Sequence, residues 1–325
     1  MKNTLPMTLL AQLDDIAVFQ TAAFASPEYV DIANSDKGSE SNQSHYQQQP
    51  EAYYANYGEL NLGLHVNDEA SAVLSNRMRV LAAINKQLSE QQNLPDHSVP
   101  VKALHWVNQV HGNHIHDIDA TALSMAPMAA DAMVSKQDGL GLAIMTADCV
   151  PIVFYQPVTG QIAAIHAGWQ GLACGVIKAT AERFSDSGQI MAWIGVCISQ
   201  ENYEVGSQVR DKLLVGCIEN NALTTDALNH FDERYVIASA TSNSAAPSTA
   251  DRLSDNAPAN ADKIKINLPK IAADHLIAAG IVVCNQLPIP CSYADDCYYS
   301  YRRQTHLQQP ATGRMALIIT RSTSI

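Results

Sequence analysis

Two histidines and one cysteine, each in a separate short motif, are the residues of this sequence best suited to chemistry. His111 lies in the run Asn-Gln-Val-His-Gly, Cys149 ends the run Thr-Ala-Asp-Cys, and His166 opens the run His-Ala-Gly-Trp. A thiolate and two neutral imidazoles suit zinc, with copper as the chemical competitor. Because three ligands leave one coordination position open, the set predicts a catalytic zinc site rather than a closed structural one.

Each of these residues also has a structural interpretation. A cysteine that follows an apolar strand is often an inert core residue, and a histidine at a strand end often only makes structural hydrogen bonds. His111 lies near His105, His114 and His116 in the sequence. Such a cluster of histidines on an exposed edge need not bind a metal. The spacing of the three candidates matches no short metal motif, so the residues alone leave both interpretations open.

The elements that must position these residues are short buried strands covered by helices. Apolar runs bounded by Gly, Pro or Asp predict strands over residues 141–145, 151–155, 161–165 and 192–198. Helical spacing of apolar residues predicts helices over residues 68–88, 171–184 and 268–279. The sequence has no glycine-rich dinucleotide motif after a strand and no P-loop motif, so neither kind of site is supported.

Length and composition predict a globular protein. The chain has 325 residues, 47% apolar and 16% charged, and can therefore bury a large core. Two polar stretches, residues 34–51 and 239–262, have no apolar period and are predicted to be surface insertions. Because neither stretch separates two halves large enough for a core each, we predict one domain over residues 1–325.

Charge and cysteine content narrow the partners and the compartment. The formal net charge of −12 disfavours nucleic acid and membrane surfaces, although a local cluster of arginines can still hold a small anion. No stretch is apolar enough to span a membrane, and the N-terminal region lacks the uninterrupted apolar run of a signal peptide. Seven cysteines, an odd number without an export signal, predict free thiols and a cytoplasmic location.

Further motifs follow one another in a fixed order from about residue 60 to the C-terminus. They are Asn61-Leu62-Gly63, His65-Val66-Asn67-Asp68, Asn76-Arg77, Trp193-Ile194-Gly195, Tyr203-Glu204-Val205-Gly206, Cys291-Ser292-Tyr293, Ser300-Tyr301-Arg302-Arg303 and Thr312-Gly313-Arg314-Met315-Ala316. Together with the three ligand motifs, they resemble the YfiH-like laccase-domain family, also described as purine nucleoside phosphorylase-like or polyphenol oxidase-like. Any one of these motifs would be a weak signal, but their shared order makes the resemblance specific.

The resemblance implies an α+β fold of layered mixed β-sheets flanked by helices, of the CNF1/YfiH-like type. It implies zinc, with copper as the other metal, held by His111, Cys149 and His166. The implied activity is phosphorolysis of adenosine to adenine and ribose 1-phosphate, with methylthioadenosine phosphorolysis and adenosine deamination as related activities. The implied partners are a purine nucleoside and phosphate, and the chain is expected to act as a monomer or homodimer.

Phosphorolysis requires a phosphate held at the sugar and stabilisation of charge on the departing base. Arg302, Arg303 and Arg314 lie in the matching motifs and could bind phosphate through forked donors, with Arg302 the first candidate for a catalytic role. In the alternative interpretation, these arginines lie in an exposed, solvated turn and bind no substrate. Asp148 is the second catalytic candidate, able to orient a ligand histidine, to activate a nucleophile, or only to cap the following turn.

Two departures from the family pattern bear on the substrate range. Position 170 is Gln where the family has Arg, and residues 195–199 read Gly-Val-Cys-Ile-Ser in place of Gly-Pro-Ala-Ile-Gly. Three other functions stay open at this point. They are a copper-dependent polyphenol oxidase, a cysteine hydrolase in which His166 activates Cys149, and a non-catalytic partner in cell-wall precursor fidelity.

Overall fold

The computed structural model describes residues 5–25, 56–91, 98–121, 126–239, 262–285 and 288–323 of the chain. The predicted insertion 34–51 lies outside the described residues, and so does the insertion 239–262 except for its two end residues. Among the described helices, none is both long enough and apolar enough to cross a membrane.

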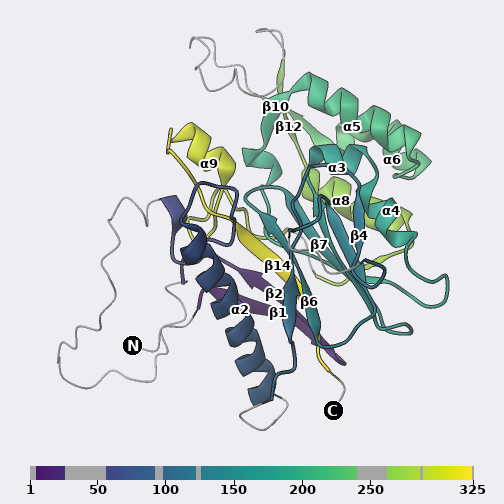
Figure 1. Ribbon diagram of the computed structural model, residues 1–325. Helices are drawn as coiled ribbons and strands as arrows, with labels where there is room; N and C mark the ends of the chain where they lie inside the picture. The colour runs from purple at the N-terminus through teal and green to yellow at the C-terminus, as the bar shows by residue number, and fades with distance from the viewer. Residues whose placement is uncertain are drawn as a thin grey trace, which may run out of the picture.

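Two large sheets and one small sheet form the framework (Figure 1). The five-stranded sheet has the order β1 (Met7–Leu13), β2 (Ile16–Thr21), β14 (Met315–Arg321), β6 (Leu140–Thr146) and β3 (Ala103–His105). The six-stranded sheet has the order β13 (Val282–Val283), β9 (Met191–Ile194), β7 (Val150–Gln156), β8 (Gln161–Ala167), β5 (Ala132–Ser135) and β4 (Ile115–Asp117). The three-stranded sheet has the order β10 (Glu204–Gly206), β12 (Lys263–Ile266) and β11 (Val236–Ala238).

Helices lie on the outer faces of the two large sheets. One long helix, α2 (Ala70–Gln91), covers the five-stranded sheet (Figure 1). The helices associated with the six-stranded and three-stranded sheets are α3 (Trp169–Ala173), α4 (Val176–Ala181), α5 (Ser207–Glu219), α6 (Thr225–Asn229), α7 (Phe231–Tyr235) and α8 (Leu268–Ala278). A short helix, α9 (Tyr301–His306), and a 3-10 turn, η2 (Gln200–Asn202), complete the described elements.

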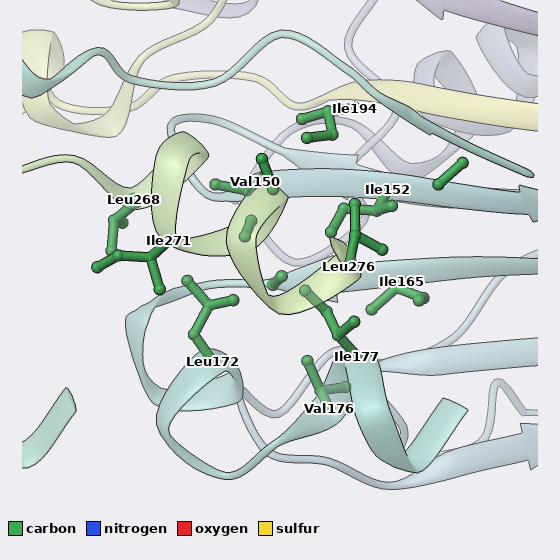
Figure 2. Packing of buried hydrophobic residues seen from close by; sticks show 14 of the residues in the cluster. Val150, Ile152, Ile165, Leu172, Val176, Ile177, Ile194, Leu268, Ile271 and Leu276 are labelled. Carbon is green, nitrogen blue, oxygen red and sulfur yellow. The ribbon is translucent and has the colours of Figure 1, made fainter. Parts of the chain in front are cut away.

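Separate apolar clusters join these layers. Val80 and Ile84 of α2 pack against Phe19 and Ile318 of the five-stranded sheet. A second cluster lies between the two large sheets. A third cluster lies between the six-stranded sheet and its helices, where Figure 2 shows Val150, Ile152, Ile165, Ile194, Leu172, Val176, Ile177, Leu268, Ile271 and Leu276. The order is therefore helix, sheet, sheet and helices.

Strands β7 and β8 contribute to two of these clusters at once, which explains their sequence. All seven residues of each strand are buried. Alternation of side chains sends Ile152 and Ile165 toward the helices and Val153 and Ala164 toward the five-stranded sheet. A strand with apolar neighbours on both faces reads as an unbroken apolar run rather than an alternating one.

The structure confirms the predicted α+β fold with mixed sheets, since parallel pairs such as β3–β6 and β4–β5 occur beside antiparallel ones. Two boundaries differ from expectation. The predicted helix 171–184 is divided into α3 and α4 at Gly175, which has a left-handed φ of 73°. The predicted strand 192–198 ends at Ile194, and beyond it the N–H of Val196 donates to the side-chain oxygen of Gln20 in β2 at 3.0 Å.

Candidate metal centre

Cys149 and His166 lie at the same end of the antiparallel pair β7–β8. Cys149 directly precedes β7, and His166 is the last residue but one of β8, where the ladder pairs it with Pro151. Their strand neighbours Val150 and Ala167 point toward the helices. Because side chains alternate, Cys149 and His166 project instead into the space between the two large sheets.

His111 reaches the same place from a loop with a left-handed backbone. Its φ is 61°, which is uncommon for a residue other than glycine. Gln109 fixes this loop to the end of β6: its side-chain amide donates to the carbonyl of Met145 at 2.8 Å and accepts from the Met145 N–H at 2.9 Å. The rings of His111 and His166 meet edge-on, with 4.7 Å between their centroids and an interplanar angle of 82°.

The three predicted ligands converge. One ligand atom from each of His111, Cys149 and His166 lies within 4.8 Å of the other two. Within the described ranges, this is the one group of three or more His, Cys, Asp or Glu side chains that meets in this way. His111 is exposed, Cys149 is partly buried and His166 is buried, so the group is reached from the His111 side. A thiol and two imidazoles are a donor set that fits zinc or copper.

A buried carboxylate, Asp131, holds two of these ligands in place. It directly precedes β5 and is fully buried. Its carboxylate accepts hydrogen bonds from the backbone N–H groups of Val110 (3.2 Å), His111 (2.8 Å) and Gly112 (2.6 Å). Oδ1 of this carboxylate, which accepts from Val110 and His111, also lies 3.0 Å from Nδ1 of His166. Asp131 therefore ties the His111 loop to the strand that carries His166.

Asp131 also determines which nitrogen of His166 faces the ligand group. Burial by itself raises the pKa of Asp131, but hydrogen bonds from His166 and from the backbone of Gly112 outweigh it and lower the pKa. An ionised carboxylate can only accept, so Nδ1 of His166 carries a hydrogen and Nε2 is the nitrogen that would bind a metal. Sequence reasoning did not single out Asp131, although a lone acidic residue inside the run Ala-Ala-Asp-Ala-Met-Val was the available signal.

Cys149 and His166 form a coupled acid–base pair. Burial by itself raises the pKa of the Cys149 thiol, but the charge of His166 and hydrogen bonds from His111 and His166 outweigh it and lower the pKa. Burial by itself lowers the pKa of His166, whereas the Cys149 thiolate and Asp131 raise it. The pair favours a thiolate, the form in which cysteine binds a metal or attacks as a nucleophile.

Asp148, the neighbour of Cys149, is bonded to helix α9 and the segment before it. Its Oδ1 accepts from the hydroxyl of Ser292 at 2.7 Å, and its Oδ2 accepts from the backbone N–H of Arg302 at 2.6 Å. Its φ of 110° is strained for a residue with a side chain. Among the described contacts it has no hydrogen bond to a ligand histidine, and Asp131 occupies that position instead.

Arg302 and Arg303 lie in the first turn of helix α9 and make different contacts. Nη1 of Arg302 donates to the carbonyl of Glu204, and its guanidinium lies 5.4 Å from the centroid of the Tyr203 ring. Arg303 instead donates to backbone carbonyls of the preceding loop, those of Ser292, Tyr293, Asp295 and Tyr298. The guanidinium of Arg303 is thus occupied in holding that loop.

Arg314, the third predicted arginine, lies at the start of strand β14 and interacts electrostatically with Cys149 and Asp148. It directly precedes Met315, the first residue of β14, which pairs with Thr146 at the end of β6. Burial lowers the pKa of Arg314, and the negative charges of Cys149 and Asp148 oppose that shift. The structure therefore places a guanidinium beside the Cys149 end of the sheet.

Trp169, in the first turn of α3, is half-buried and packs against the apolar cluster under the helices. The ammonium of Lys212 lies 5.6 Å from its ring centroid. Gln170, which stands where the family has Arg, is exposed. These contacts give Trp169 a packing role.

Sequence comparison relates the chain to a described family and to named proteins. The sequence model of a family described as "Multi-copper polyphenol oxidoreductase laccase" matches residues 48–322. The protein named purine nucleoside phosphorylase YfiH of Escherichia coli is 39% identical over 159 residues, which cover 49% of this chain and 59% of the relative. A protein of Pseudomonas aeruginosa, also named purine nucleoside phosphorylase, is 30% identical over 267 residues, which cover 82% of this chain and 87% of the relative. The chain thus spans a little over half of the Escherichia coli relative.

Solved structures with the same fold cover nearly the whole chain. A Neisseria meningitidis protein of the family DUF152 superposes with a TM-score of 0.61 at 25% identity and covers 98% of this chain and 100% of its own. A Bacillus licheniformis protein titled YfiH superposes with a TM-score of 0.62 at 22% identity and covers 98% of this chain and 97% of its own. Both share the layered arrangement of mixed sheets and helices.

Proposed function

The chain belongs to the family described as multi-copper polyphenol oxidoreductase laccase, as its motifs predicted, and from this membership we propose a metal-dependent purine nucleoside phosphorylase. The proposed reaction converts adenosine and phosphate to adenine and ribose 1-phosphate. Relatives that carry the name purine nucleoside phosphorylase support this activity. The observation that carries the proposal is the convergence of His111, Cys149 and His166 within 4.8 Å, together with the electrostatic interaction between Arg314 and Cys149.

We assign metal binding to His111, Cys149 and His166, with zinc as the metal. A bound zinc ion would supply a Lewis acid at this position. Copper is the competing metal, but oxidation of phenols by dioxygen uses several copper ions to transfer four electrons. In the part of the chain that the structure describes, one such ligand group is found, which favours zinc.

The proposed reaction balances without an oxidant. An oxygen of phosphate forms a bond to the anomeric carbon of the ribose, while the bond from that carbon to the purine nitrogen breaks. The electron pair of the broken bond leaves with the purine, which takes up a proton. Phosphate must be held in line with the breaking bond, a task suited to the forked donors of an arginine.

Within this proposal, Arg314 binds phosphate, while Asp148 and Arg302 are positioning residues. Asp148 fixes the first turn of α9 through the N–H of Arg302, and Arg302 in turn holds the carbonyl of Glu204. Arg303 keeps the loop before α9 in place. Methylthioadenosine phosphorolysis and adenosine deamination are proposed as further activities of the same site.

The test is to incubate metal-analysed protein with adenosine, with and without phosphate, and to separate adenine, inosine and hypoxanthine. Adenine that forms only with phosphate supports phosphorolysis, and inosine measures deamination directly. His111→Ala should lose both the metal and the activity. A zinc-loaded wild-type protein that yields no product from adenosine overturns the proposal and favours the non-catalytic partner.

A cysteine hydrolase is the second candidate, because the neighbouring histidines lower the pKa of the Cys149 thiol. In that reading His166 would activate Cys149, as a base activates a nucleophile in other covalent enzymes. A substrate-like electrophile should then trap Cys149 in metal-free, active protein. The phosphorylase proposal predicts instead that metal-free protein has no activity.

A further inference from the structure

Two arginines beside the metal centre have no carboxylate partner. Among the described residues, the arginines that pair with Asp side chains are Arg210, Arg234, Arg303 and Arg321. Arg77, Arg302 and Arg314 form no ion pair within the described ranges, although all three are partly buried and the chain carries a net charge of −12. Arg302 contacts the Tyr203 ring and the carbonyl of Glu204. A partly buried charge is ordinarily paired, so the unpaired guanidinium groups of Arg77 and Arg314 in an acidic protein point to an anion from outside the chain.

Hydrogen bonds hold Arg77 in a fixed position but use only some of its N–H donors. It comes from α2, and its Nε and Nη2 both donate to the carbonyl of Leu62, at 3.0 Å and 2.8 Å. Its guanidinium lies over the Trp106 ring, 4.2 Å from the centroid. Nη1 has no acceptor among the described residues. Desolvation lowers the pKa of Arg77 to about 10, so the group stays charged at neutral pH.

Arg77 is also connected to the His111 loop. Its Nη2 approaches the sulfur of Met145 at 3.5 Å. Both backbone polar groups of Met145 are bonded to the side chain of Gln109, two residues before His111. One residue of β6 therefore contacts both Arg77 and the loop that carries a metal ligand.

Arg314 lies against the same loop that Arg77 holds. A Cβ atom added to Gly63 would lie 2.8 Å from Cγ of Arg314, so glycine is required there for the side chain to pass. Asn61 fixes the two segments together, since its Oδ1 accepts from the N–H of Gly63 at 3.0 Å and from that of Arg314 at 2.8 Å. Nη1 of Arg314 donates to the carbonyls of Thr312 and Gly313, whereas Nε and Nη2 have no acceptor among the described residues.

His65 relates the two arginines to the metal ligands. Desolvation lowers the pKa of His65, and the charges of Arg314 and Arg77 lower it further, followed by those of His111 and His166. The charges of both guanidinium groups and of both histidine ligands thus act on one imidazole. The loop that carries His65, held by Arg77 at Leu62 and packed on Arg314 at Gly63, forms this side of the centre.

We propose that Arg77 and Arg314, on either side of the loop that carries His65, form the subsite that binds the phosphate co-substrate next to the metal centre. This inference rests on the proposed phosphorylase function and assigns a second arginine to it. Two guanidinium groups offer several N–H donors to one phosphate and match its charge. A free orthophosphate and the phosphate of a nucleotide share this chemistry, and we assign the subsite to orthophosphate.

The direct test is the binding of orthophosphate to zinc-loaded protein in the absence of nucleoside, measured by calorimetry. Arg77→Gln and Arg314→Gln should each raise the Kd for phosphate by at least about tenfold, as loss of a charge-assisted hydrogen bond implies. Arg79→Gln is the matched control. Arg79 is an exposed arginine of the same helix that contacts Asn76 and the carbonyl of Glu59, so the variant removes the same charge outside the subsite.

Steady-state kinetics give the second measurement. The KM for phosphate should rise at least about tenfold in Arg77→Gln and Arg314→Gln, while the KM for adenosine stays within about twofold of wild type. Arg77→Lys keeps the charge but loses the fork, and it replaces Arg77→Gln if that variant does not fold. Folded variants that bind phosphate as wild type does overturn the subsite.

The two proposals can fail separately. If the wild-type protein makes adenine but the arginine variants bind phosphate normally, the phosphorylase proposal stands and the subsite proposal is overturned. If the wild-type protein binds phosphate through these arginines but makes no adenine, the two arginines form an anion site and the phosphorylase proposal is overturned. Arginine-dependent binding of adenosine monophosphate, without binding of orthophosphate, would assign the subsite to a nucleotide and overturn the proposal.

Discussion

The carboxylate of Asp131 lies 3.0 Å from Nδ1 of His166, and its two oxygens also accept the backbone N–H groups around His111. One buried side chain therefore fixes the ring of one proposed ligand and the backbone of another. Outer partners of this kind orient metal-binding histidines and commonly alter metal affinity when they are removed.

Replacement of this carboxylate should weaken metal binding. Asp131→Asn keeps the shape of the side chain but offers one acceptor oxygen in place of two, so it cannot serve all its present donors. We expect zinc affinity to fall by roughly 10- to 100-fold, measured by competition with a chromophoric chelator. Asp119→Asn is the control, because Asp119 accepts from Ser135 and Lys136 nearby but contacts no ligand. Equal zinc affinity in Asp131→Asn and wild type would show that Asp131 has no part in the site.

The thiol of Cys149 should react quickly in metal-free protein and slowly in zinc-loaded protein. Although burial opposes ionisation, His166 and His111 lower the pKa of Cys149, so a larger thiolate fraction exists at pH 7 than in a free cysteine. Iodoacetamide labelling followed by peptide mapping measures each cysteine separately. The exposed Cys174 serves as the internal reference whose labelling zinc leaves unchanged. Labelling of Cys149 that is independent of zinc contradicts its assignment as a ligand.

Arg303 should contribute to stability rather than to phosphate affinity. Its guanidinium donates to several backbone carbonyls of the loop before α9, among them those of Ser292 and Tyr293. Arg303→Met leaves these carbonyls without their donor and should lower the free energy of unfolding by about 1 to 3 kcal/mol. Urea unfolding tests this, with Arg183→Met as the control for loss of an exposed arginine. An increase in the KM for phosphate without a loss of stability would return Arg303 to the phosphate site.

Acid should destabilise the protein partly through His275 in α8. Burial lowers the pKa of His275 to about 4, and its Nε2 lies 3.2 Å from the sulfur of Cys217. The unfolded chain binds a proton to this histidine near pH 6.5, whereas the folded chain does not until about pH 4. His275 therefore does not reduce the free energy of unfolding above pH 6.5. Between pH 6.5 and pH 4, protonation of the unfolded chain lowers this free energy by about 3 kcal/mol at most.

Unfolding measured from pH 8 to pH 4 tests this assignment. His275→Gln, which does not titrate, should lose less stability than wild type across the interval below pH 6.5. Parallel losses in the two proteins would exclude His275 as the source. The quantity to compare is the slope of the free energy of unfolding against pH, rather than the free energy itself. This slope separates the effect of proton binding from any change in packing.

Much of the fold and the three side chains that converge could be predicted from the sequence, because those signals are local. The apolar runs of β7 and β8 are buried on both faces, so their composition alone identifies strands. Three motifs supplied the ligand candidates, and the shared order of these and the further motifs supplied the family. The break at Gly175 was missed because the apolar period continues through it, although the backbone there is left-handed.

The organisation around the ligands depends on contacts between distant segments and could not be predicted. Asp131 is 20 residues from His111 and 35 from His166 in the chain, and nothing in the run around it specifies either partner. The same holds for Arg77, which donates to the carbonyl of Leu62, and for Arg314, which packs against Gly63. Asp148 was assigned by its position next to Cys149, yet its side chain bonds to α9.

The hairpin β7–β8 has a consequence for how such proteins can vary. Its ladder runs without a bulge from Val150 opposite Ala167 to Gln156 opposite Gln161. Adding or deleting one residue within either strand would turn Cys149 or His166 to the opposite face of the sheet. Side chains along these strands can be exchanged for others of similar volume, but the number of residues between Cys149 and His166 is set by geometry. Length changes that preserve the centre must therefore fall in the turn beyond Gln156 or outside the hairpin altogether.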